Sequence, residues 1–228
     1  GVQTCALPIY ERTSTTAVNA YVMPRVASYL TALQQKLIDM GLKTKLLMLQ
    51  SNGGAASLDQ LIRQPVNLLL SGPSAGVGAM QHLASGIGEN NLVSMEIGGT
   101  SCDVMLMHEG RVAITDSLSV NDYDLVTPSV DIHTVGAGGG TIAGIDGAGL
   151  MYAGPEGAGA RPGPAAYGHG GTRPTVTDAH LLLGRMRAGP YAGGSVSLDM
   201  SLAEKALDTE IADKTGISRT EAAAGLIR

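Results

Sequence analysis

The sequence contains no tryptophan and no phenylalanine, and aromatic residues make up only 3% of its 228 residues. Leucine, valine, isoleucine and methionine must therefore fill the core, and Met95, Met105 and Met107 are expected to lie there. Charge is also scarce. Charged residues make up 15%, and the net charge of −5 is not that of a nucleic-acid-binding surface. The hydrophobic content of 44% is nevertheless sufficient for a packed core.

Cysteines and long apolar runs are equally few. Cys5 and Cys102 are the only cysteines, which predicts no disulfide framework and favours a reducing, cytoplasmic location. No apolar run reaches the roughly 18 residues that a membrane span requires, and the first residues lack the features of a signal peptide. We therefore expect neither a membrane nor nucleic acid as a partner.

Hydrophobic periodicity predicts helices and short strands in the first part of the chain. Apolar residues spaced by three and four predict a helix or a broken pair of helices over residues 11–41, with Pro24 in a first turn or at a kink and Gly41 at its end. The further elements expected are strands at 45–50 and 66–70, a helix at 57–63 capped by Ser57, and a helix from about 74 to 85.

The second part is predicted to begin with strands and to end in helices. Residues 136–172 contain fourteen glycines, which exclude a regular helix and indicate either a functional loop system or a flexible region. Thr177 is expected to cap a helix, and Ser201 with Glu204 to form a capping box. The elements expected are strands at 92–97, 104–107 and 111–115 with a turn at Gly110, extended chain at 125–135, and helices at 177–186, 201–214 and 218–228.

The chain is interpreted as three segments. Residues 1–10, GVQTCALPIY, resemble the translation of a sequencing-adaptor read, so we interpret them as a non-native extension in which Cys5 has no role. Residues 11–190 carry the glycine-rich motifs. Residues 191–228 are predicted to be a helical segment that ends without a stop signal, so a fragment truncated at its C-terminus is expected.

The stretch VSMEIGGTSCDVMLM places a polar turn between two apolar segments. Gly98 and Gly99 allow left-handed backbone or close approach to a ligand, and Thr100 and Ser101 add hydroxyl donors to an anion-binding nest of amides. Asp103 would repel a bare phosphate but suits one that carries a divalent cation. The turn is therefore either a Mg²⁺–nucleotide site, with Asp103 as catalytic group and metal ligand, or an ordinary tight turn capped by its aspartate and serine. A Walker loop is excluded because no lysine follows the glycines.

A second glycine run, Gly136 to Gly140, also has two interpretations. Gly138, Gly140 and Ala143 match the G-x-G-x-x-A pattern of dinucleotide-binding proteins. That pattern requires a helix directly afterwards, and the glycine-rich residues that follow are not predicted to form one. A contact with a nucleotide and a plain glycine-rich turn remain as alternatives.

The succession of strands around the first glycine turn resembles the phosphate turn of the actin, sugar-kinase and chaperone ATPase superfamily.

Seven motifs carry a more specific resemblance to one family. In order, the motifs are ERTSTTAVNAYV (11–22), LQSNGG (49–54), LSGPSAGV (70–77), GGTSCDV (98–104), DIHTVGAGGGTIA (131–143), GARPGPAAYGHGGTRPTVTDA (159–179) and LGRM (183–186). Together, over roughly residues 11–190, they resemble the hydantoinase A / 5-oxoprolinase family.

This resemblance implies the fold and the cofactors. The fold class would be α/β, an actin-like or ribonuclease H-like domain with a mixed sheet flanked by helices and a long glycine-rich loop region. The cofactors would be ATP and Mg²⁺, with Asp103 as the catalytic and metal-binding residue. The residues implied in nucleotide binding are Gly98, Gly99, Thr100, Ser101, Gly136, Gly138, Gly139 and Gly140.

The resemblance also implies an activity and partners. Family members use ATP to open cyclic amides such as 5-oxoproline or N-methylhydantoin, in a reaction that activates the amide carbonyl oxygen by phosphorylation. A hydantoinase B-like subunit or domain would complete the active site, and the full-length protein would be an oligomer. Because the superfamily's first phosphate turn would belong to an N-terminal domain that this chain lacks, the isolated chain is expected to be inactive.

Two other functions remain open. The first is the ATP-using subunit of an acetone-type ketone carboxylase, because some relatives carboxylate ketones instead and no residue separates the two activities. It could also be a non-catalytic module that binds a nucleotide to switch a partner.

Some residues depart from the family pattern or have no assigned role. Glu96 and Cys102 stand where the family carries aspartate and threonine, Arg161 where it tends to carry aspartate, and His180 where it tends to carry asparagine. Asp131 and His133 alternate along an expected strand, as a metal pair or as a hydrogen-bonded pair at the rim of a site. Asp178 is interpreted as a possible helix cap.

Overall fold

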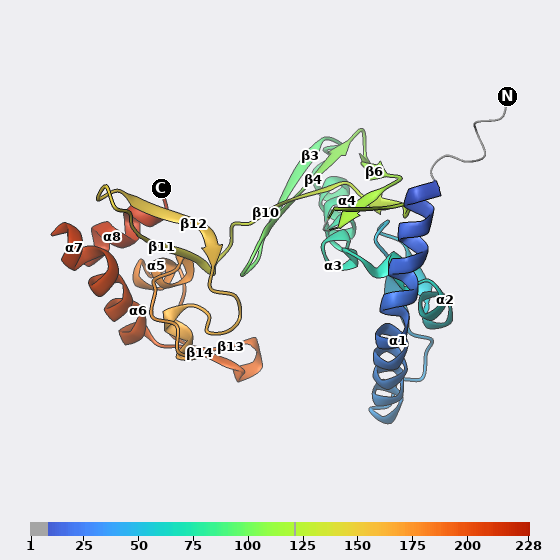
Figure 1. Ribbon diagram of the computed structural model, residues 1–228, viewed down its shortest axis with the longest axis horizontal. Helices are drawn as coiled ribbons and strands as arrows, with labels where there is room; N and C mark the ends of the chain where they lie inside the picture. Colours follow the sequence, from blue (N-terminus) through green and yellow to red (C-terminus); the bar gives the residue numbers. More distant parts are fainter. Residues whose placement is uncertain (1–8, 121) are drawn as a thin grey trace. The chain divides into compact units, whose positions relative to one another are not determined.

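The computed structural model describes residues 9–120 and 122–228. These residues form two compact units (Figure 1). The first unit contains the described residues up to Ser94 together with Val104–His133, and the second contains Met95–Asp103 and Thr134–Arg228. Most of the predicted extension at residues 1–10, including Cys5, lies outside the described residues. Ile9 and Tyr10 begin the first helix.

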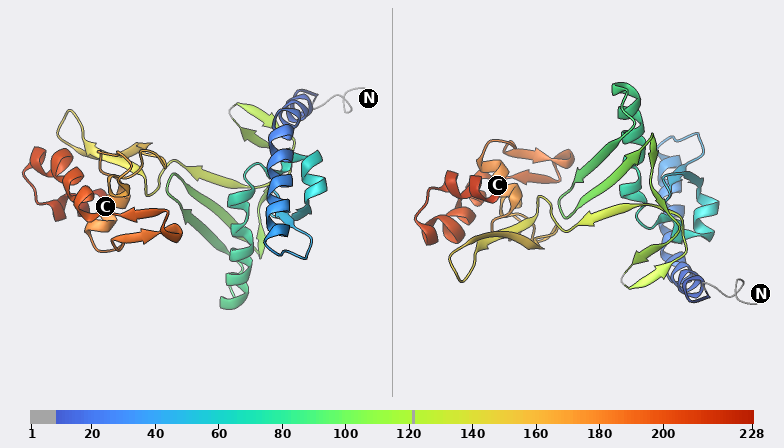
Figure 2. Two further views of the ribbon diagram at one scale, coloured as in Figure 1. Left: turned by 90° about the horizontal axis from the view of Figure 1, so that it is seen from below. Right: turned by 90° about the horizontal axis from the view of Figure 1, so that it is seen from above.

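The first unit is built on the long helix α1 (Ile9–Asp39), which confirms the predicted helix and contains Pro24 in its interior. Gly41, with a φ of +99°, follows its end in a left-handed conformation that suits glycine. Leu30 is buried against Leu58 and Leu61 of helix α2 (Leu58–Arg63). Both views of Figure 2 show α2 beside α1. No helix in the described part of the chain is both long and apolar enough to span a bilayer.

A polar contact fixes the segment that follows α2. The Asn19 side chain on α1 donates to the Arg63 carbonyl and accepts from the Val66 amide, each at 3.2 Å. Residues Pro65–Leu68 then form the 3₁₀ turn η1, so the strand predicted at 66–70 is wrong. Pro65 begins the turn, because its fixed φ and missing amide suit the start of a helical turn better than a strand. Pro65 and Val66 are buried in this turn, whereas Leu68 and Leu69 are half-buried and Leu70 is exposed.

The other elements near η1 agree largely with the sequence. Ser57 caps α2 by accepting from the Gln60 amide, as predicted. Strand β1 (Leu47–Leu49) lies within the predicted strand, and a turn connects it to β2 (Ala55–Ser57), which was not predicted. The glycine-rich run at 71–78 opens two helices, α3 (Ser71–Ser74) and α4 (Gly76–Ile87).

The main sheet has the order β10-β4-β3, with strand β5 (Arg111–Val112) paired to β4. Its other strands are β3 (Leu92–Ile97), β4 (Cys102–His108) and β10 (Ile132–Val135). The turn between β4 and β5 has positive φ at Glu109 and Gly110, as the sequence predicted for Gly110.

Methionines fill the core beneath this sheet in the first unit. Met105 and Met107 are buried against Met80 of α4, as predicted. Met95 is 65% exposed, so its predicted place in the core is wrong. It shares one exposed face of β3 with Val93 and Ile97, because alternate residues of a strand point to the same side.

Short strand pairs complete the first unit. The predicted strand 111–115 is divided, since Ala113 separates β5 from β6, and the extended chain expected at 125–135 contains β9 and β10. The pairs are β6 (Ile114–Thr115) with β9 (Ser129–Val130), and β7 (Leu118–Val120) with β8 (Tyr123–Leu125).

The second unit packs helices against a hairpin that lies inside the glycine-rich segment. Strands β11 (Thr141–Ile145) and β12 (Met151–Gly157) pair antiparallel, which the composition of residues 136–172 did not predict. Ala143 of β11 packs against helices α5 (Val176–Leu182) and α8 (Arg219–Leu226), whose small alanines allow close approach. Figure 1 shows these helices beside the hairpin.

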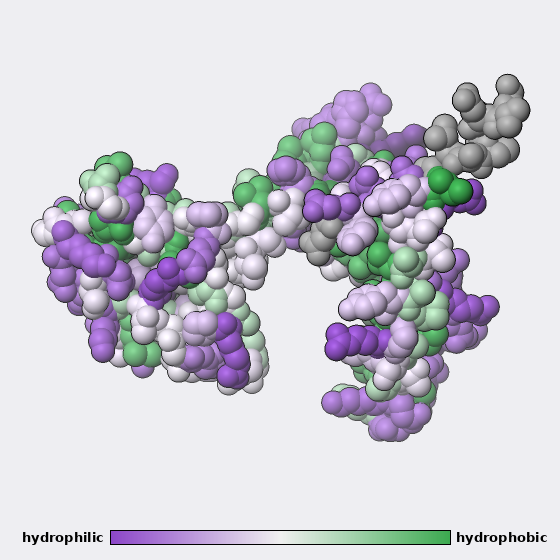
Figure 3. Space-filling model, viewed as in Figure 1, coloured by the Kyte–Doolittle hydropathy of each residue, from purple (hydrophilic) through white to green (hydrophobic). Residues whose placement is uncertain are grey.

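The last residues contain more than the predicted helices. The strand pair β13–β14 precedes helix α6, whose cap is Asp199 rather than Ser201, because the Asp199 carboxylate accepts from the Ser201 amide at 2.8 Å. Ser218 and Glu221 form a capping box on α8. Charged side chains on these helices lie on a largely hydrophilic surface (Figure 3). The remaining elements are η2 (Ala165–Tyr167), β13 (Gly189–Tyr191), η3 (Ala192–Gly194), β14 (Val196–Leu198), α6 (Met200–Leu207), the π-helical turn η4 (Asp208–Ala212) and α7 (Asp213–Thr215).

A buried carboxylate joins α5 to the loop before it. Asp178 is fully buried and accepts from the Ala166 amide and from the amide and hydroxyl of Thr175, each at 2.8 Å, and from the Ala165 amide at 3.2 Å. Thr175, not the predicted Thr177, is the helix cap. Burial raises the pKa of the Asp178 carboxyl, although these donors oppose the rise. Its role is therefore structural.

We expect Asp178→Asn to lower the free energy of unfolding by about 2–4 kcal/mol, because an amide nitrogen would face donors that the second carboxylate oxygen now satisfies. Urea denaturation measures the change. Asp199→Asn is the matched control and should change stability by less than about 0.5 kcal/mol, because asparagine caps a helix as well as aspartate. Equal stability of wild type and Asp178→Asn would contradict the structural role.

Candidate functional site

The first glycine motif forms the turn between β3 and β4. The Gly98 amide donates to the Ser101 carbonyl at 2.8 Å, and residues 98–100 are exposed. Neither glycine has a positive φ, so left-handed backbone does not explain them. A Cβ added at Gly99 would meet nothing within 4 Å, so packing within the chain does not require glycine there either. Neither backbone conformation nor packing within the described chain therefore requires glycine at position 99.

The second glycine run lies directly against this turn. The Gly139 amide donates to the Gly98 carbonyl at 2.9 Å, and the Gly140 amide donates to the Gly99 carbonyl at 2.6 Å. A Cβ at Gly138 or Gly140 would lie 2.8 Å from one of these carbonyl oxygens, which is closer than real Cβ atoms come. Two motifs that are far apart in the sequence therefore meet through backbone atoms, and glycine at 138 and 140 makes this contact possible.

Further hydrogen bonds hold the second run in place. The Gly139 carbonyl accepts from the Thr177 amide at the start of α5 at 2.7 Å, and the Gly140 carbonyl accepts from the Ala158 amide at 2.8 Å. The Gly138 amide donates to the hydroxyl of Thr141 at 2.8 Å. The run is thus connected to α5, to β11 and to the loop after β12. Thr177, which was predicted as a helix cap, contacts this run instead.

Gly136 differs from the glycines that follow it. It is exposed, has no positive φ, and a Cβ there would meet nothing within 4 Å. The strand β11 begins directly after Gly140, where a dinucleotide-binding fingerprint requires a helix. The weak fingerprint of Gly138, Gly140 and Ala143 is therefore excluded as a Rossmann site.

Asp103 lies on β4, two residues beyond the turn, and is partly exposed. Its Oδ1 accepts from the Thr134 hydroxyl on the neighbouring strand β10 at 2.7 Å, so the aspartate does not cap the turn. Sequence reasoning missed Thr134, because a single threonine in a strand carries no chemical signature. The hydrogen bond fixes one carboxylate oxygen and leaves the other available to a ligand.

The turn therefore presents free donors beside a carboxylate. Within the described residues, the amides of Gly99 and Thr100 and the hydroxyls of Thr100 and Ser101 make no hydrogen bond to the protein. Such donors fit an anion. No group of three or more His, Cys, Asp or Glu residues in the described ranges could hold a metal ion by itself. A single carboxylate such as Asp103 is nevertheless compatible with Mg²⁺, because this ion commonly takes one or two carboxylates together with phosphate and water oxygens.

The other predicted residues are less informative. Cys102 is a buried free thiol, which favours its interpretation as a small packing residue, and Glu96 is exposed. Asp131 and His133 are exposed and form no side-chain hydrogen bond in the described part of the chain, so the structure supports neither a metal pair nor a hydrogen-bonded pair.

His180 is partly buried. Burial lowers the pKa of its imidazole, with a smaller contribution from Arg185, and its Nδ1 lacks a partner among the described residues.

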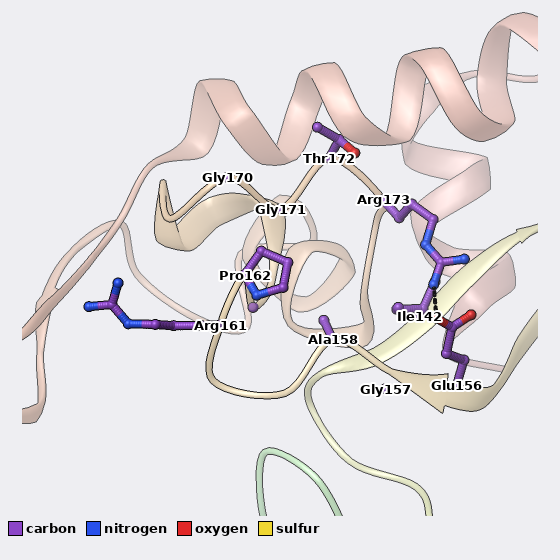
Figure 4. Close-up of a pocket in the computed structure, with 11 residues that line it drawn as sticks. Ile142, Glu156, Gly157, Ala158, Arg161, Pro162, Gly170, Gly171, Thr172 and Arg173 are labelled. Atoms are coloured by element: carbon purple, nitrogen blue, oxygen red, sulfur yellow. Dashed lines mark ion pairs between the residues drawn. The ribbon is translucent and has the colours of Figure 1, made fainter.

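Sequence reasoning also missed a cleft of about 290 Å³ in the second unit (Figure 4). Arg173 forms an ion pair with Glu156 at 2.6 Å at its edge, and this arginine lowers the pKa of the Glu156 carboxyl. The Ala158 amide bonds to Gly140, so the cleft wall is connected to the second glycine run. The lining residues are Ile142, Glu156, Gly157, Ala158, Arg161, Pro162, Gly163, Gly170, Gly171, Thr172 and Arg173.

We expect Gly138→Ala to lower the free energy of unfolding by about 1–3 kcal/mol, because its methyl group would force the two glycine runs apart. Gly147→Ala is the matched control: this exposed glycine has no positive φ and no neighbour within 4 Å, so its change should stay within about 0.5 kcal/mol. Thermal unfolding of both variants measures the difference. Equal effects would show that the contact between the runs is not tight.

The sequences of curated relatives align with most of this chain. Caprolactamase subunit alpha of Pseudomonas jessenii is 39% identical over 96% of the chain and 31% of its own length. The 5-oxoprolinase of Saccharomyces cerevisiae is 34% identical over 77% of the chain and 13% of its own length. The chain thus spans a third or less of the length of these relatives.

Two solved structures share the fold. The ATP-dependent caprolactamase of Pseudomonas jessenii matches 96% of this chain and 32% of its own, with a TM-score of 0.74 at 39% identity. A nucleotide-free structure of acetone carboxylase matches 87% of this chain and 28% of its own, also with a TM-score of 0.74, at 31% identity. Both confirm the predicted α/β fold class and are consistent with an actin-like ATPase fold.

The family model described as hydantoinase/oxoprolinase matches residues 12–228, which is nearly the whole chain. The predicted family is thereby confirmed: the chain belongs to the hydantoinase/oxoprolinase family.

Proposed function

We propose that this chain is the nucleotide-binding part of an ATP-dependent hydrolase that opens cyclic amides with the help of Mg²⁺. The observation that carries the proposal is the exposed turn at Gly98–Ser101, whose free amides and hydroxyls lie beside Asp103. Relatives named caprolactamase and 5-oxoprolinase support the cyclic amide as substrate. A solved relative named ATP-dependent supports the nucleotide.

Each part of the turn has a separate role in this proposal. The amides of Gly99 and Thr100 and the nearby hydroxyls hold phosphate oxygens. Asp103 holds Mg²⁺ or a water bound to it, and Thr134 keeps the carboxylate oriented. The second run, Gly136 to Gly140, contacts the nucleotide on its exposed side, where Gly136 leaves room for close approach.

The chemistry follows from the poor reactivity of amides. ATP, when bound, would supply the phosphoryl group that activates the amide carbonyl oxygen, so that attack by water can break the ring C–N bond with release of ADP and phosphate. The turn's contribution is to hold the phosphates in position and to neutralise their charge, which is the main protein contribution in phosphoryl transfer.

Other protein parts complete this activity in our proposal. The chain spans 31% of caprolactamase subunit alpha, whose name indicates a multi-subunit enzyme. We propose that a further domain supplies a second phosphate turn and that a hydantoinase B-like subunit or domain contributes to the active site of an oligomer. The 228 residues alone should then show no turnover.

An ATP-using ketone carboxylase is the second candidate, favoured by the structural similarity to acetone carboxylase. A substrate screen of the complete enzyme with its partner separates the two reactions. Acid release from lactams supports the hydrolase, and bicarbonate-dependent consumption of a ketone supports the carboxylase. ATP turnover that needs neither substrate and changes the conformation of a partner would instead support a nucleotide switch.

We expect Asp103→Asn to bind ATP about tenfold more weakly in Mg²⁺, a loss of about 1.4 kcal/mol. In EDTA the same variant should bind ATP as well as wild type or better, because a like charge near the phosphates has been removed. Isothermal titration of the 228-residue chain measures both affinities. Asp213→Asn, an exposed carboxylate on α7, is the control. A loss of affinity that is equal with and without Mg²⁺ would contradict the role in metal binding.

We expect Gly99→Ala to weaken ATP binding about tenfold while changing the free energy of unfolding by less than about 0.5 kcal/mol. The reason is that a Cβ at Gly99 has open space around it in the chain, yet would occupy the position of a phosphate. Titration and thermal unfolding of one preparation give both values. Unchanged ATP affinity would remove Gly99 from the proposed site.

A further inference from the structure

The turn LQSNGG has no part in the proposed nucleotide site. It joins β1 to β2 in the first unit and contains the dipeptide Asn52–Gly53. The chain has six asparagines, and Asn52 is the only one that a glycine follows. This neighbour matters because the amide nitrogen of the next residue can attack an asparagine side chain. Glycine has no side chain that would shield this nitrogen.

The Asn52 side chain is exposed and folds back toward the main chain of the turn. Its Oδ1 accepts from the Gly54 amide at 2.9 Å. A Cβ at Gly54 would lie 3.0 Å from this oxygen, so glycine at position 54 leaves room for the contact. The Nδ2 group of Asn52 donates to no acceptor among the described residues, so no hydrogen bond within them holds it in place.

These contacts favour attack on the side-chain amide of Asn52. The Gly54 amide would stabilise the negative charge that develops on Oδ1, as a donor does in an oxyanion hole. The attacking nitrogen of Gly53 donates to the Gln50 carbonyl at 3.0 Å, so this bond has to open before the reaction. Because Asn52 and Gly54 are exposed, the opening needs only a local movement of the turn.

We propose that Asn52 is a site of spontaneous modification, where the side-chain amide cyclises with Gly53 and becomes aspartate or isoaspartate. In the first step the Gly53 nitrogen forms a bond to Cγ of Asn52 and the Cγ–Nδ2 bond breaks. The proton lost from the Gly53 nitrogen leaves with Nδ2 as ammonia. Water then opens the succinimide ring. Attack at the side-chain carbonyl gives aspartate, and attack at the main-chain carbonyl gives isoaspartate.

The modification would act on a point where three segments of the first unit meet. The carbonyl of Ser51, directly before Asn52, accepts from the Val130 amide and from the Ser74 hydroxyl, each at 2.8 Å. Either product adds a negative charge beside this point, and isoaspartate also lengthens the main chain there. We therefore expect the modified chain to unfold at a lower temperature than the unmodified chain.

The test is incubation of the folded 228-residue chain in mildly alkaline buffer, followed by peptide mass spectrometry. Asn52 should be converted about tenfold faster than Asn90 or Asn91, which are also exposed but are not followed by glycine. Labelling with an isoaspartyl methyltransferase identifies the isoaspartate product. The rate should rise with pH, because the Gly53 nitrogen has to lose its proton to attack.

Gly54→Ala separates the contribution of the turn from that of the local sequence. The variant keeps the Asn52–Gly53 pair, but its methyl group displaces Oδ1 from the amide of residue 54. Conversion in the folded variant should be about threefold slower. In urea, where the turn is absent, both chains should react at the same rate. Gly78→Ala is the matched control in the first unit, because this exposed glycine has no positive φ and no neighbour within 4 Å.

Three results would overturn the proposal: no conversion of Asn52 in the folded chain, conversion no faster than at Asn90 and Asn91, or conversion that Gly54→Ala does not slow. Thermal unfolding shows whether Gly54→Ala remains folded. The comparison of the three asparagines uses the wild-type chain alone, so it decides the proposal even if the variant fails to fold.

Discussion

The contact on which the candidate site depends is made entirely by backbone atoms. The carbonyls of Gly98 and Gly99 accept from the amides of Gly139 and Gly140, and the space between the two runs excludes any side chain at 138 or 140. Among the described residues, the Gly99 and Thr100 amides of the same turn donate to no acceptor. The turn thus joins two distant segments through its carbonyls and keeps two of its amides free of hydrogen bonds within the described part of the chain.

The glycines of this chain therefore fall into two groups that the sequence cannot separate. Gly138 and Gly140 are required by packing within the chain, since a Cβ would meet a carbonyl oxygen. Gly99 and Gly136 have open space and no positive φ, so the fold itself does not explain them. Composition predicted only that these segments are not helical. Only the structure separates the glycines that packing requires from those that it does not require.

Sequence patterns predicted the structure correctly where a helix or strand is determined by the residues within its own segment. The periodicity before Gly41 predicted α1, and the apolar segments around Gly98 predicted β3 and β4. The contiguous turn between them could be recognised as a candidate site for the same reason. Predictions failed where distant residues decide: Asn19 on α1 holds the turn η1, and Asp178 on α5 accepts from Ala166 in the preceding turn η2. Thr134 and the cleft around Arg161 arise only from tertiary contacts.

The burial of Cys102 gives this protein an internal reporter. Cys102 is 8% exposed as a residue and lies on β4, immediately before Asp103. A thiol reagent can react with it only when the end of β4 opens, so the labelling rate follows the local opening of this strand. In a Cys5→Ser background the signal comes from one position, and any molecule that clamps the adjacent turn slows the modification without itself needing a label.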